Sequence, residues 1–373
     1  MCFKSLFGIL GLALLPSISI ASDARSTGMG KAGVASADYT VASFYNPALL
    51  ATPDQLHGFG AVIAASYAYR QNKENANKVK GIEQFDDLYS LSPENISSEL
   101  IELTNNNLSS LDGKAIDMSN MEAAYAFAIP NAVLPISFFI QGESTRVDSV
   151  HSADYKTGSV ESTKDRIENS THDKYHFFVA NYGVTFAQLL NIRGETISLG
   201  ISPKYQKMST RTSQDTSGVD DAEVKNYGSG VNFDLGALWY RGPWRMALSV
   251  RDIIGQEVDV DESSHYELNP YATLGGAYTG YNYVLTADID LNKQEHFSHL
   301  DDETQFVRFG AEMGTSGWIQ FRVGYEADLE DTVDNLLTMG IGLSPWQVVH
   351  LDLAYSYRKE SSIGFMMNLK VTL

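Results

Sequence analysis

The sequence predicts an all-β fold, a transmembrane antiparallel β-barrel of about 14 strands with an N-terminal plug and a helical insertion in the first extracellular loop. Three observations predict it: apolar residues alternate along many short segments, the links between these segments alternate in length, and the chain ends on a strand. In the last twelve residues, SIGFMMNLKVTL, every second residue is apolar. Such alternation is typical of a strand with one apolar face. Because an unpaired terminal strand invites aggregation, we expect it to pair with the first strand and close a barrel.

The first 21 residues have the pattern of a secretory signal peptide. Lys4 precedes an apolar run from Leu6 to Leu15, and small residues at Ser19 and Ala21 indicate cleavage after Ala21. The only cysteine is Cys2, so the mature chain would contain no disulfide or thiol site. We predict a signal peptide over residues 1–21, a plug over 22–54 and a barrel over 55–373. The barrel would lie in the outer membrane of a Gram-negative bacterium, inserted by the barrel assembly machinery.

Composition supports this class. Of the 373 residues, 43% are hydrophobic and 11% aromatic, yet no internal stretch approaches the roughly 20 continuous apolar residues of a membrane helix. The formal net charge of -19 argues against nucleic acid as a partner. Membrane lipids and lipopolysaccharide are the expected partners, the latter bridged to acidic outer loops by divalent cations.

Glycines, alanines and an Asn-Pro-Ala triplet dominate the segment that precedes the first strand. Gly28, Gly30 and Gly33 match the spacing of a dinucleotide-binding loop, but that loop must follow a strand, and here a signal peptide precedes it. We interpret the segment as a plug, because a barrel of 14 strands encloses more space than its side chains fill. Small residues allow close packing against the wall, and Asn46, Pro47 and Ala48 would form a turn.

The clearest strands lie in the last third of the chain. They are TQFVRFGAEM (304–313), WIQFRVGYE (318–326), NLLTMGIGLS (335–344) and VVHLDLAYSY (348–357). Each is close to the roughly 9 to 11 residues of a tilted membrane strand. Apolar residues outside, polar residues inside and aromatic residues near strand ends, as at Tyr325, Trp346 and Tyr357, are typical of outer-membrane barrels. The alternative is a soluble sandwich or lipocalin-like barrel, whose apolar face would point inward.

The connections give an independent indication. With a first strand at about residues 56–69, long extracellular links and short periplasmic links should alternate. The long class comprises residues 70–120, 148–173, 209–222, 252–270, 292–303 and 327–334. The short class comprises PNAVLP at Pro130, the longer AQLLNIRGE at Ala187, RGP at Arg241, TG at Thr279, GTSG at Gly314 and SPW at Ser344. Only the last hairpin, around Lys359, is shorter than expected, and an even strand number places both termini on the periplasmic side.

The longest loop contains a predicted helix. Ser92 is a plausible N-cap, with Pro93 at the first helical position and Glu94 in the first turn. An apolar stripe follows at helical spacing, formed by Ile96, Leu100, Leu103, Leu108 and Leu111. Such a helix could cover the barrel mouth or cradle an apolar ligand; alternatively, it packs on the base of its own loop.

Two resemblances extend this reading. The string RSTGMGKAGVASADYTVASFYNPALLA resembles the start of mature FadL-like proteins, the long-chain fatty acid transporters. That resemblance implies a plug that shifts and releases a hydrophobic ligand sideways through a kinked wall strand, here residues 136–147 with a bend at Gly142. With RMALSVRDIIG, LTADIDLN and QFVRFGAEM further along, nearly the whole mature chain is similar to the family labelled conjugal transfer protein TraF.

Charged residues on the predicted inner face form a second candidate site. They are Asp288, Asp290, Arg308, Glu312, Arg322, Asp352 and Lys370. Opposite charges can pair in a lumen, away from lipid. They would either hold the plug to the wall or contact a ligand.

The sequence contains few indications of a catalytic or metal site. The sequence has no nucleophile-elbow motif, no H-E-x-x-H and no cysteine in the mature chain, so we expect no enzyme and no cofactor. His296 and His299, with Asp301, Asp302 and Glu303, suggest either a metal site or a solvated acidic loop, and we predict no metal. The leading hypothesis is a FadL-like barrel that binds or passively transports a small hydrophobic molecule. The alternative is a structural or interaction protein linked to conjugal transfer.

Overall fold

The computed structural model describes residues 23–53, 58–154, 158–216, 219–220, 224–260, 265–294, 303–314, 318–346, 348–359 and 362–373. The predicted signal peptide lies outside these residues. So do His296, His299, Asp301 and Asp302 of the suggested metal loop.

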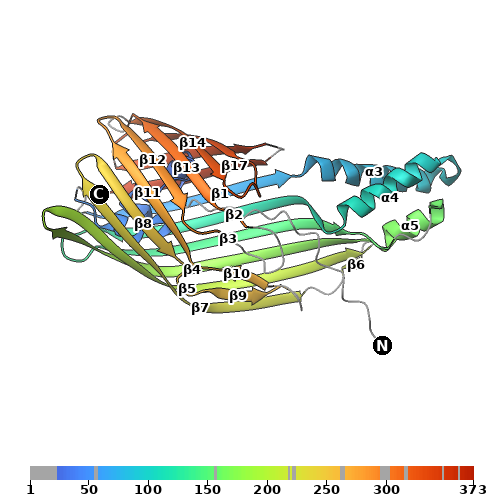
Figure 1. Cartoon of the computed structure of the whole chain (residues 1–373), viewed down its shortest axis with the longest axis horizontal. Helices are drawn as coiled ribbons and strands as arrows, with labels where there is room; N and C mark the ends of the chain where they lie inside the picture. Colours follow the sequence, from blue (N-terminus) through green and yellow to red (C-terminus); the bar gives the residue numbers. More distant parts are fainter. Residues whose placement is uncertain are drawn as a thin grey trace.

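Fourteen strands of the described chain form a closed antiparallel barrel in which each strand pairs with the next and β1 pairs with β17 (Figure 1). They are β1 Gly60–Gln71, β2 Lys114–Ile129, β3 Ile136–His151, β4 Thr171–Ile192, β5 Glu195–Thr216, β7 Val224–Arg241, β8 Trp244–Arg251, β11 Tyr271–Thr279, β12 Tyr283–Asp290, β13 Phe306–Met313, β14 Ile319–Asp328, β15 Leu336–Leu343, β16 Val349–Arg358 and β17 Ser362–Thr372. Both the strand number and the pairing of the last strand with the first confirm the prediction. The short β6 (Val219–Asp220) extends the edge of β5, and β9 (Gln256–Asp259) pairs with β10 (His265–Leu268) in a separate hairpin.

The barrel wall has two heights. Strands β4 and β5 contain 22 residues each, whereas β8, β12, β13 and β15 contain 8. At a rise of about 3.3 Å per residue, these lengths correspond to roughly 70 Å and 26 Å. We call β2, β3, β4, β5 and β7 the tall wall, and Figure 1 shows it continuing far past the other strands. The β9–β10 hairpin lies against it, with the Tyr266 ring stacked on Phe177 at 5.3 Å.

The two faces of the barrel differ in chemistry as the alternation predicts. On the neighbouring strands β14 and β15, Phe321, Val323 and Met339 are each more than half exposed, while the residues between them are buried on the lumen side. The outer face is therefore an apolar belt suited to a bilayer, and the lumen is lined by polar side chains. A soluble barrel with an apolar interior, the alternative left open by the sequence, is wrong.

Link lengths alternate as expected, with two corrections. The predicted long link 209–222 is mostly strand, since β5 runs to Thr216 and β7 begins at Val224. The predicted linker AQLLNIRGE at Ala187 is mostly strand, since β4 runs to Ile192 and β5 begins at Glu195. Arg193 and Gly194 alone make the turn, with φ of 55° and 86°. Positive φ at both central residues is the geometry that matches the twist of a tight hairpin.

The loop helices are α3 (Lys73–Leu91), η3 (Pro93–Asn95), α4 (Ser98–Leu111) and α5 (Val160–Glu168). The predicted helix start at Ser92 is wrong: η3 is a single 3-10 turn, and α4 begins after Ser97, whose Oγ accepts from the Leu100 N–H at 3.2 Å. None of the helices in the described part of the chain combines the length and the apolar character of a membrane span.

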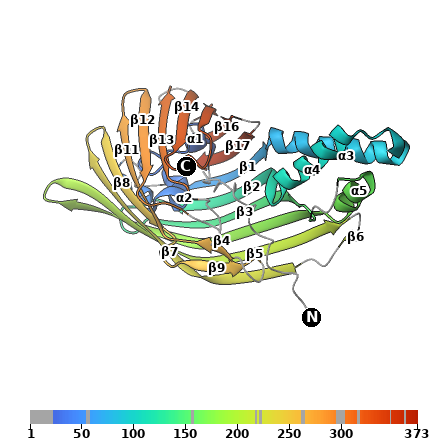
Figure 2. The ribbon, with the colours of Figure 1, turned by 45° about the vertical axis from the view of Figure 1, so that its right-hand side comes forward.

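These helices pack on one another beyond the end of the tall wall and do not lie over the plug (Figures 1 and 2). Buried Arg166 of α5 donates to the Asn105 main-chain carbonyl and to Ser109 Oγ of α4. Leu108 and Leu111 are buried, whereas Leu103 is half exposed. The α4 helix therefore packs on α3 of its own loop and on α5 of the loop between β3 and β4.

The alternating links predict which turns are reachable from outside the cell. Leu91 and Val133 are almost equally exposed, at 82% and 81%, and lie on opposite ends of the barrel. We expect a membrane-impermeant maleimide to label Leu91→Cys on intact cells and to label Val133→Cys only after the outer membrane is permeabilised. Gel shift of the labelled protein measures this, and labelling of Val133→Cys on intact cells would contradict the topology.

Candidate functional site: the plug and the lumen

Residues 23–53 fill the lumen as four short turns, α1 (Ala24–Thr27), η1 (Tyr39–Val41), α2 (Ala42–Tyr45) and η2 (Pro47–Leu50). Figure 2 shows α1 and α2 enclosed by the strands. Asp23 caps α1 by accepting from the Ser26 N–H at 3.2 Å. Phe44, Leu49 and Leu50 are fully buried. This plug packs as a small core against the inner wall.

Glycines on both partners bring the plug backbone into contact with the wall. Gly30 has a φ of 68° and donates its N–H to Thr338 Oγ1 at 2.8 Å. A Cβ on Gly324 of β14 would lie 1.9 Å from the Gly30 nitrogen, and one on Gly28 would lie 3.0 Å from the Gly340 Cα. Gly33 instead makes room for the Tyr45 ring. Only residues without side chains allow two backbones to approach this closely.

The Asn-Pro-Ala triplet joins the other side of the plug to β5, β7 and β8. Asn46 Oδ1 accepts from the Ala48 N–H at 3.0 Å, while its Nδ2 donates to the Ala237 carbonyl at 3.3 Å. Pro47 occupies the first position of η2, where no N–H is needed. The Ala48 carbonyl accepts from Ser198 Oγ at 2.7 Å. The triplet thus forms a turn and a wall contact together.

On the opposite wall, charged side chains connect the plug to β13, β14 and β16. Arg25 of the plug binds Glu312 through two hydrogen bonds of 2.9 Å. Arg322 joins Glu312 at 2.6 Å to Asp352 at 2.7 Å. All three wall residues are at least 94% buried. Buried charges persist only when paired, so the plug arginine completes a wall network.

The remaining charges predicted to face the lumen lie there as well, in two arrangements. Asp288 Oδ2 accepts from the Gly33 and Val34 N–H groups at 2.8 and 2.9 Å, and Lys370 Nζ lies 3.1 Å from Asp38 Oδ2 of the plug. Arg308 instead pairs within the wall, with Asp290 at 2.8 Å.

Sequence reasoning missed Glu326, which joins the wall to the plug. Its carboxylate is fully buried and binds Arg308, Arg358 and, at 3.2 Å, Lys31 of the plug. The signal was present: Glu326 follows Arg322 by four residues, an even spacing that places both on the same face of β14. It was overlooked because it falls at the end of the predicted strand.

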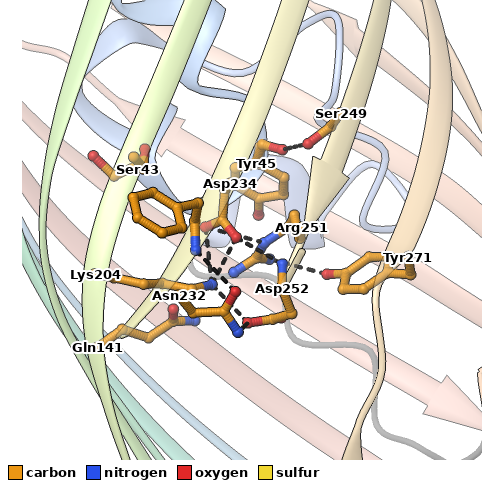
Figure 3. A network of polar contacts seen from close by, with 12 residues as sticks. Ser43, Tyr45, Gln141, Lys204, Asn232, Asp234, Ser249, Arg251, Asp252 and Tyr271 are labelled. Carbon is orange, nitrogen blue, oxygen red and sulfur yellow. Dashed lines mark hydrogen bonds and ion pairs between the residues drawn. The ribbon is translucent and has the colours of Figure 1, made fainter. Parts of the chain in front are cut away.

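A second polar network was also missed, on β5, β7 and β8 near the plug (Figure 3). Lys204 Nζ lies 2.7 Å from Asp234 and 2.8 Å from Asp252. Asp252 follows the last residue of β8 and has a φ of 51°. Burial alone would raise the pKa of Asp252, but the Lys204 ammonium and the Arg251 guanidinium outweigh it and lower the pKa. The network therefore favours the charged form of Asp252 at the point where the short β8 ends beside the longer β7.

The wall strand expected to be kinked is regular. Gly142 of β3 pairs with Ala123 on one side and Ala180 on the other, and the register shift of the β2–β3 pairing lies far from it, between Ala115 and Asp117. The suggested bend at Gly142 is therefore wrong. The pairing of β4 with β5 is instead interrupted at Val184 and Thr185, between the pairs of Gly183 and Phe186. Pro203 lies opposite this interruption and has no N–H to donate.

The lumen face of the tall wall carries an apolar cluster. Met118, Val147, Tyr175 and Phe177 form a buried cluster with Val260, and Tyr266 of the β9–β10 hairpin packs on it. Within the described residues, no three His, Cys, Asp or Glu side chains are grouped as metal ligands.

Comparisons with known proteins agree with this architecture. The family model described as F plasmid transfer operon, TraF, protein matches residues 43–290. The toluene transporter TbuX of Ralstonia pickettii has a similar structure, with a TM-score of 0.57 and 11% identity over 94% of this chain and 97% of that chain. The Pseudomonas putida toluene transporter TodX gives a TM-score of 0.53 and 11% identity over 94% and 96%. At such identity the likeness shows a shared fold. No curated protein matches the sequence.

Because Gly324 contacts the plug backbone, we predict that a single added methyl group at this position lowers the stability of the barrel. Gly324→Ala should push Gly30 from the wall and destabilise the folded barrel by about 1–3 kcal/mol. Gly276→Ala on β11 is the matched control, since its Cβ would meet no atom within 4 Å. Urea unfolding in phospholipid vesicles, followed by tryptophan fluorescence, measures both variants. Equal unfolding midpoints would contradict the close plug–wall contact.

The Arg25–Glu312–Arg322 contacts predict a second effect. Glu312→Gln leaves two buried arginines short of a carboxylate and should cost about 3 kcal/mol in the free energy of unfolding. Glu303→Gln, which removes an exposed pair with Lys293, should cost less than about 1 kcal/mol. The same unfolding assay compares the two, and a smaller cost for Glu312→Gln than for Glu303→Gln would show that the network does not hold the plug.

Proposed function

The chain belongs to the F plasmid transfer operon TraF protein family, and from that premise and its fold we propose that it is an outer-membrane barrel that binds a small hydrophobic molecule or lets it pass. The observation that carries the proposal is the likeness to toluene transporters over 94% of the chain. Passive movement needs no catalytic or nucleotide site, so the proposal involves no enzyme activity.

The apolar cluster on the tall wall supports a hydrophobic cargo. It lies on the lumen face above the plug, and the β9–β10 hairpin supplies Val260 and Tyr266 to it. A ligand that displaced Val260 and Tyr266 would bury its own apolar surface against the cluster, and the cluster would remain shielded from water. Ligand sites of this kind are concave, largely apolar and supplied with a few oriented polar groups.

The contacts between the plug and the wall support a plug that moves and acts as a gate. Glycine contacts, hydrogen bonds and ion pairs connect it to the wall, and among the described residues no disulfide or shared strand fixes the plug to the wall. Each such contact can break and form again as the plug shifts. We include in the proposal that residues 1–21 are a cleaved signal peptide, that 22–54 are the plug and that 55–373 are the barrel.

A second candidate is favoured by the family and by the outer helices. The description of the family refers to a plasmid transfer operon. The bundle of α3, α4 and α5 extends past the barrel, where another cell or protein can contact it. Deletion of the gene would then lower mating frequency and leave uptake of hydrophobic compounds unchanged.

Locking the plug to the wall tests the gate. Ser43 Oγ lies 2.7 Å from Thr185 Oγ1 of β4, so a Ser43→Cys, Thr185→Cys pair meets the short reach of a disulfide. We expect the oxidised pair to abolish protein-dependent entry of the hydrophobic probe N-phenyl-1-naphthylamine into intact cells, and dithiothreitol to restore it. Probe fluorescence gives the entry rate.

Thr185 also provides the control. Its Oγ1 lies 2.7 Å from Ser202 Oγ of β5, so Thr185→Cys with Ser202→Cys links wall to wall and leaves the plug free. This lock should retain wild-type uptake in both redox states. If the plug lock retains it too, passage does not require the plug to move.

A further inference from the structure

A row of basic side chains crosses the outer face of the tall wall. Strand pairing places its four members side by side on β3, β4, β5 and β7: Arg146, His176, Arg211 and Lys225. The chain neighbours Val147 and Phe177 are buried on the lumen side, so the row faces outward. Arg211 and Lys225 are exposed, and the Arg146 side chain is 44% exposed. We call these four residues the basic row.

Toward the periplasm, the outward residues of the same strands become apolar. Two positions below the basic row lie Phe178 on β4 and Tyr227 on β7, both exposed. Six positions below it, a second cross-strand row is apolar or aromatic throughout, and its members are 43% to 55% exposed: Ile140, Tyr182, Tyr205 and Val231. Aromatic residues flank the lipid-facing band of such barrels. The basic row therefore lies where the lipid head groups begin.

The height of the basic row agrees with this position. Arg146 lies ten residues after Ile136, with which β3 begins at its periplasmic end. Ten residues span about 33 Å along a strand, or about 25 Å across the membrane at a tilt of about 40°. The apolar band of an outer-membrane barrel is about 25 Å tall. The basic row thus marks the outer boundary of the membrane.

The positive charge is confined to this part of the outer face. The formal net charge of the whole chain is -19. Outside the tall wall, the described strand residues that face outward include no Lys or Arg. On the tall wall a further cation lies below the row, since Lys207 of β5 is exposed and its Nζ lies 5.9 Å from the centre of the Tyr205 ring. A lysine at this depth extends its ammonium toward the head groups while its stem covers apolar surface.

Carboxylates adjoin one end of the basic row. Asp148 accepts two hydrogen bonds from Arg146, at 3.0 and 2.9 Å, and pairs across the strands with Asp117. Exposed ion pairs contribute little to stability, so a phosphate group can replace such a carboxylate. A guanidinium group binds phosphate through two parallel N–H groups, a geometry that lysine lacks. Arg146 and Arg211 lie two strands apart, which corresponds to about 10 Å.

We propose that the basic row and Lys207 bind the head group of an outer-leaflet lipid that carries a phosphate at each end of a disaccharide, as lipid A does. Arg211 and Lys225, on adjacent strands, hold one phosphate, and Lys207 approaches it from below. Arg146 holds the other phosphate, and the acyl chains lie on the apolar row. This contact needs no divalent cation, unlike a bridge to the acidic outer loops. It goes beyond the proposed function, because it concerns the outer face and not the lumen.

Lipids that differ in their phosphate groups test the proposal. The full barrel in detergent is titrated with bisphosphoryl lipid A, with monophosphoryl lipid A of the same acyl chains, and with phosphatidylglycerol. Native mass spectrometry measures the bound fraction of each lipid. We expect bisphosphoryl lipid A to bind at least tenfold more tightly than either of the others, because it makes two sets of charge-assisted hydrogen bonds where they make one. Its binding should persist in EDTA.

Matched variants assign the contact to the basic row. Arg211→Gln combined with Lys225→Gln removes two cations and should weaken binding of bisphosphoryl lipid A about tenfold or more. Arg211→Lys keeps the charge but loses the paired N–H groups, so it should weaken binding by a smaller factor. This variant keeps the proposal testable if the double variant fails to fold. The control is Lys293→Gln on an outer loop, whose side chain is 47% exposed and whose loss should leave binding unchanged.

Three results would overturn the proposal. Unchanged binding in both Arg211 variants would show that the basic row does not contact the head group. Equally tight binding of phosphatidylglycerol would show that any anionic lipid suffices. Loss of binding in EDTA would reassign the lipid to divalent cations held by the acidic loops. None of these measurements involves passage through the lumen, so each outcome leaves the proposed function standing.

Discussion

The structure depends on one constraint: inside a bilayer, every backbone N–H and C=O must be satisfied within the protein. A sheet meets it only by closing, which the pairing of β1 with β17 achieves. Closing 14 strands leaves a lumen wider than their side chains fill, and the plug occupies it. The wall must then hold the plug with groups that face inward, so the inner charges and glycines follow from the closure.

Much of this could be predicted because one period governs every strand. Alternation gave the number of strands, the outward apolar face and the inward position of Arg308, Arg322 and Asp352. Partner identities could not be predicted in the same way. Arg25 meets Glu312 across 287 residues of sequence, and that meeting depends on strand register and on the path of the plug, neither of which the spacing of residues encodes.

The polar network around Lys204 could not be predicted from the sequence for a different reason. It exists because β8 stops at Arg251 while β7 continues, which brings Asp252 back beside Asp234 and Lys204. The sequence does predict the end of β8, since the predicted link begins at residue 252, but it does not encode the register that places Asp234 and Lys204 beside Asp252. The loop helices illustrate the same limit. Ser97 and Ser92 are both acceptable caps, and only the extended backbone at Ile96 decides between them.

The position of the plug in the chain determines the order of assembly. The plug precedes β1, yet its partners extend from Ser137 on β3 to Lys370 on β17. It cannot complete its contacts until the final strand is present. The β1–β17 ladder joins segments about 300 residues apart and must form late, because long loops close at an entropic cost. Seating of the plug and closure of the wall therefore belong to the same final stage of folding, and a chain that stalls there exposes both an unpaired edge and an empty lumen.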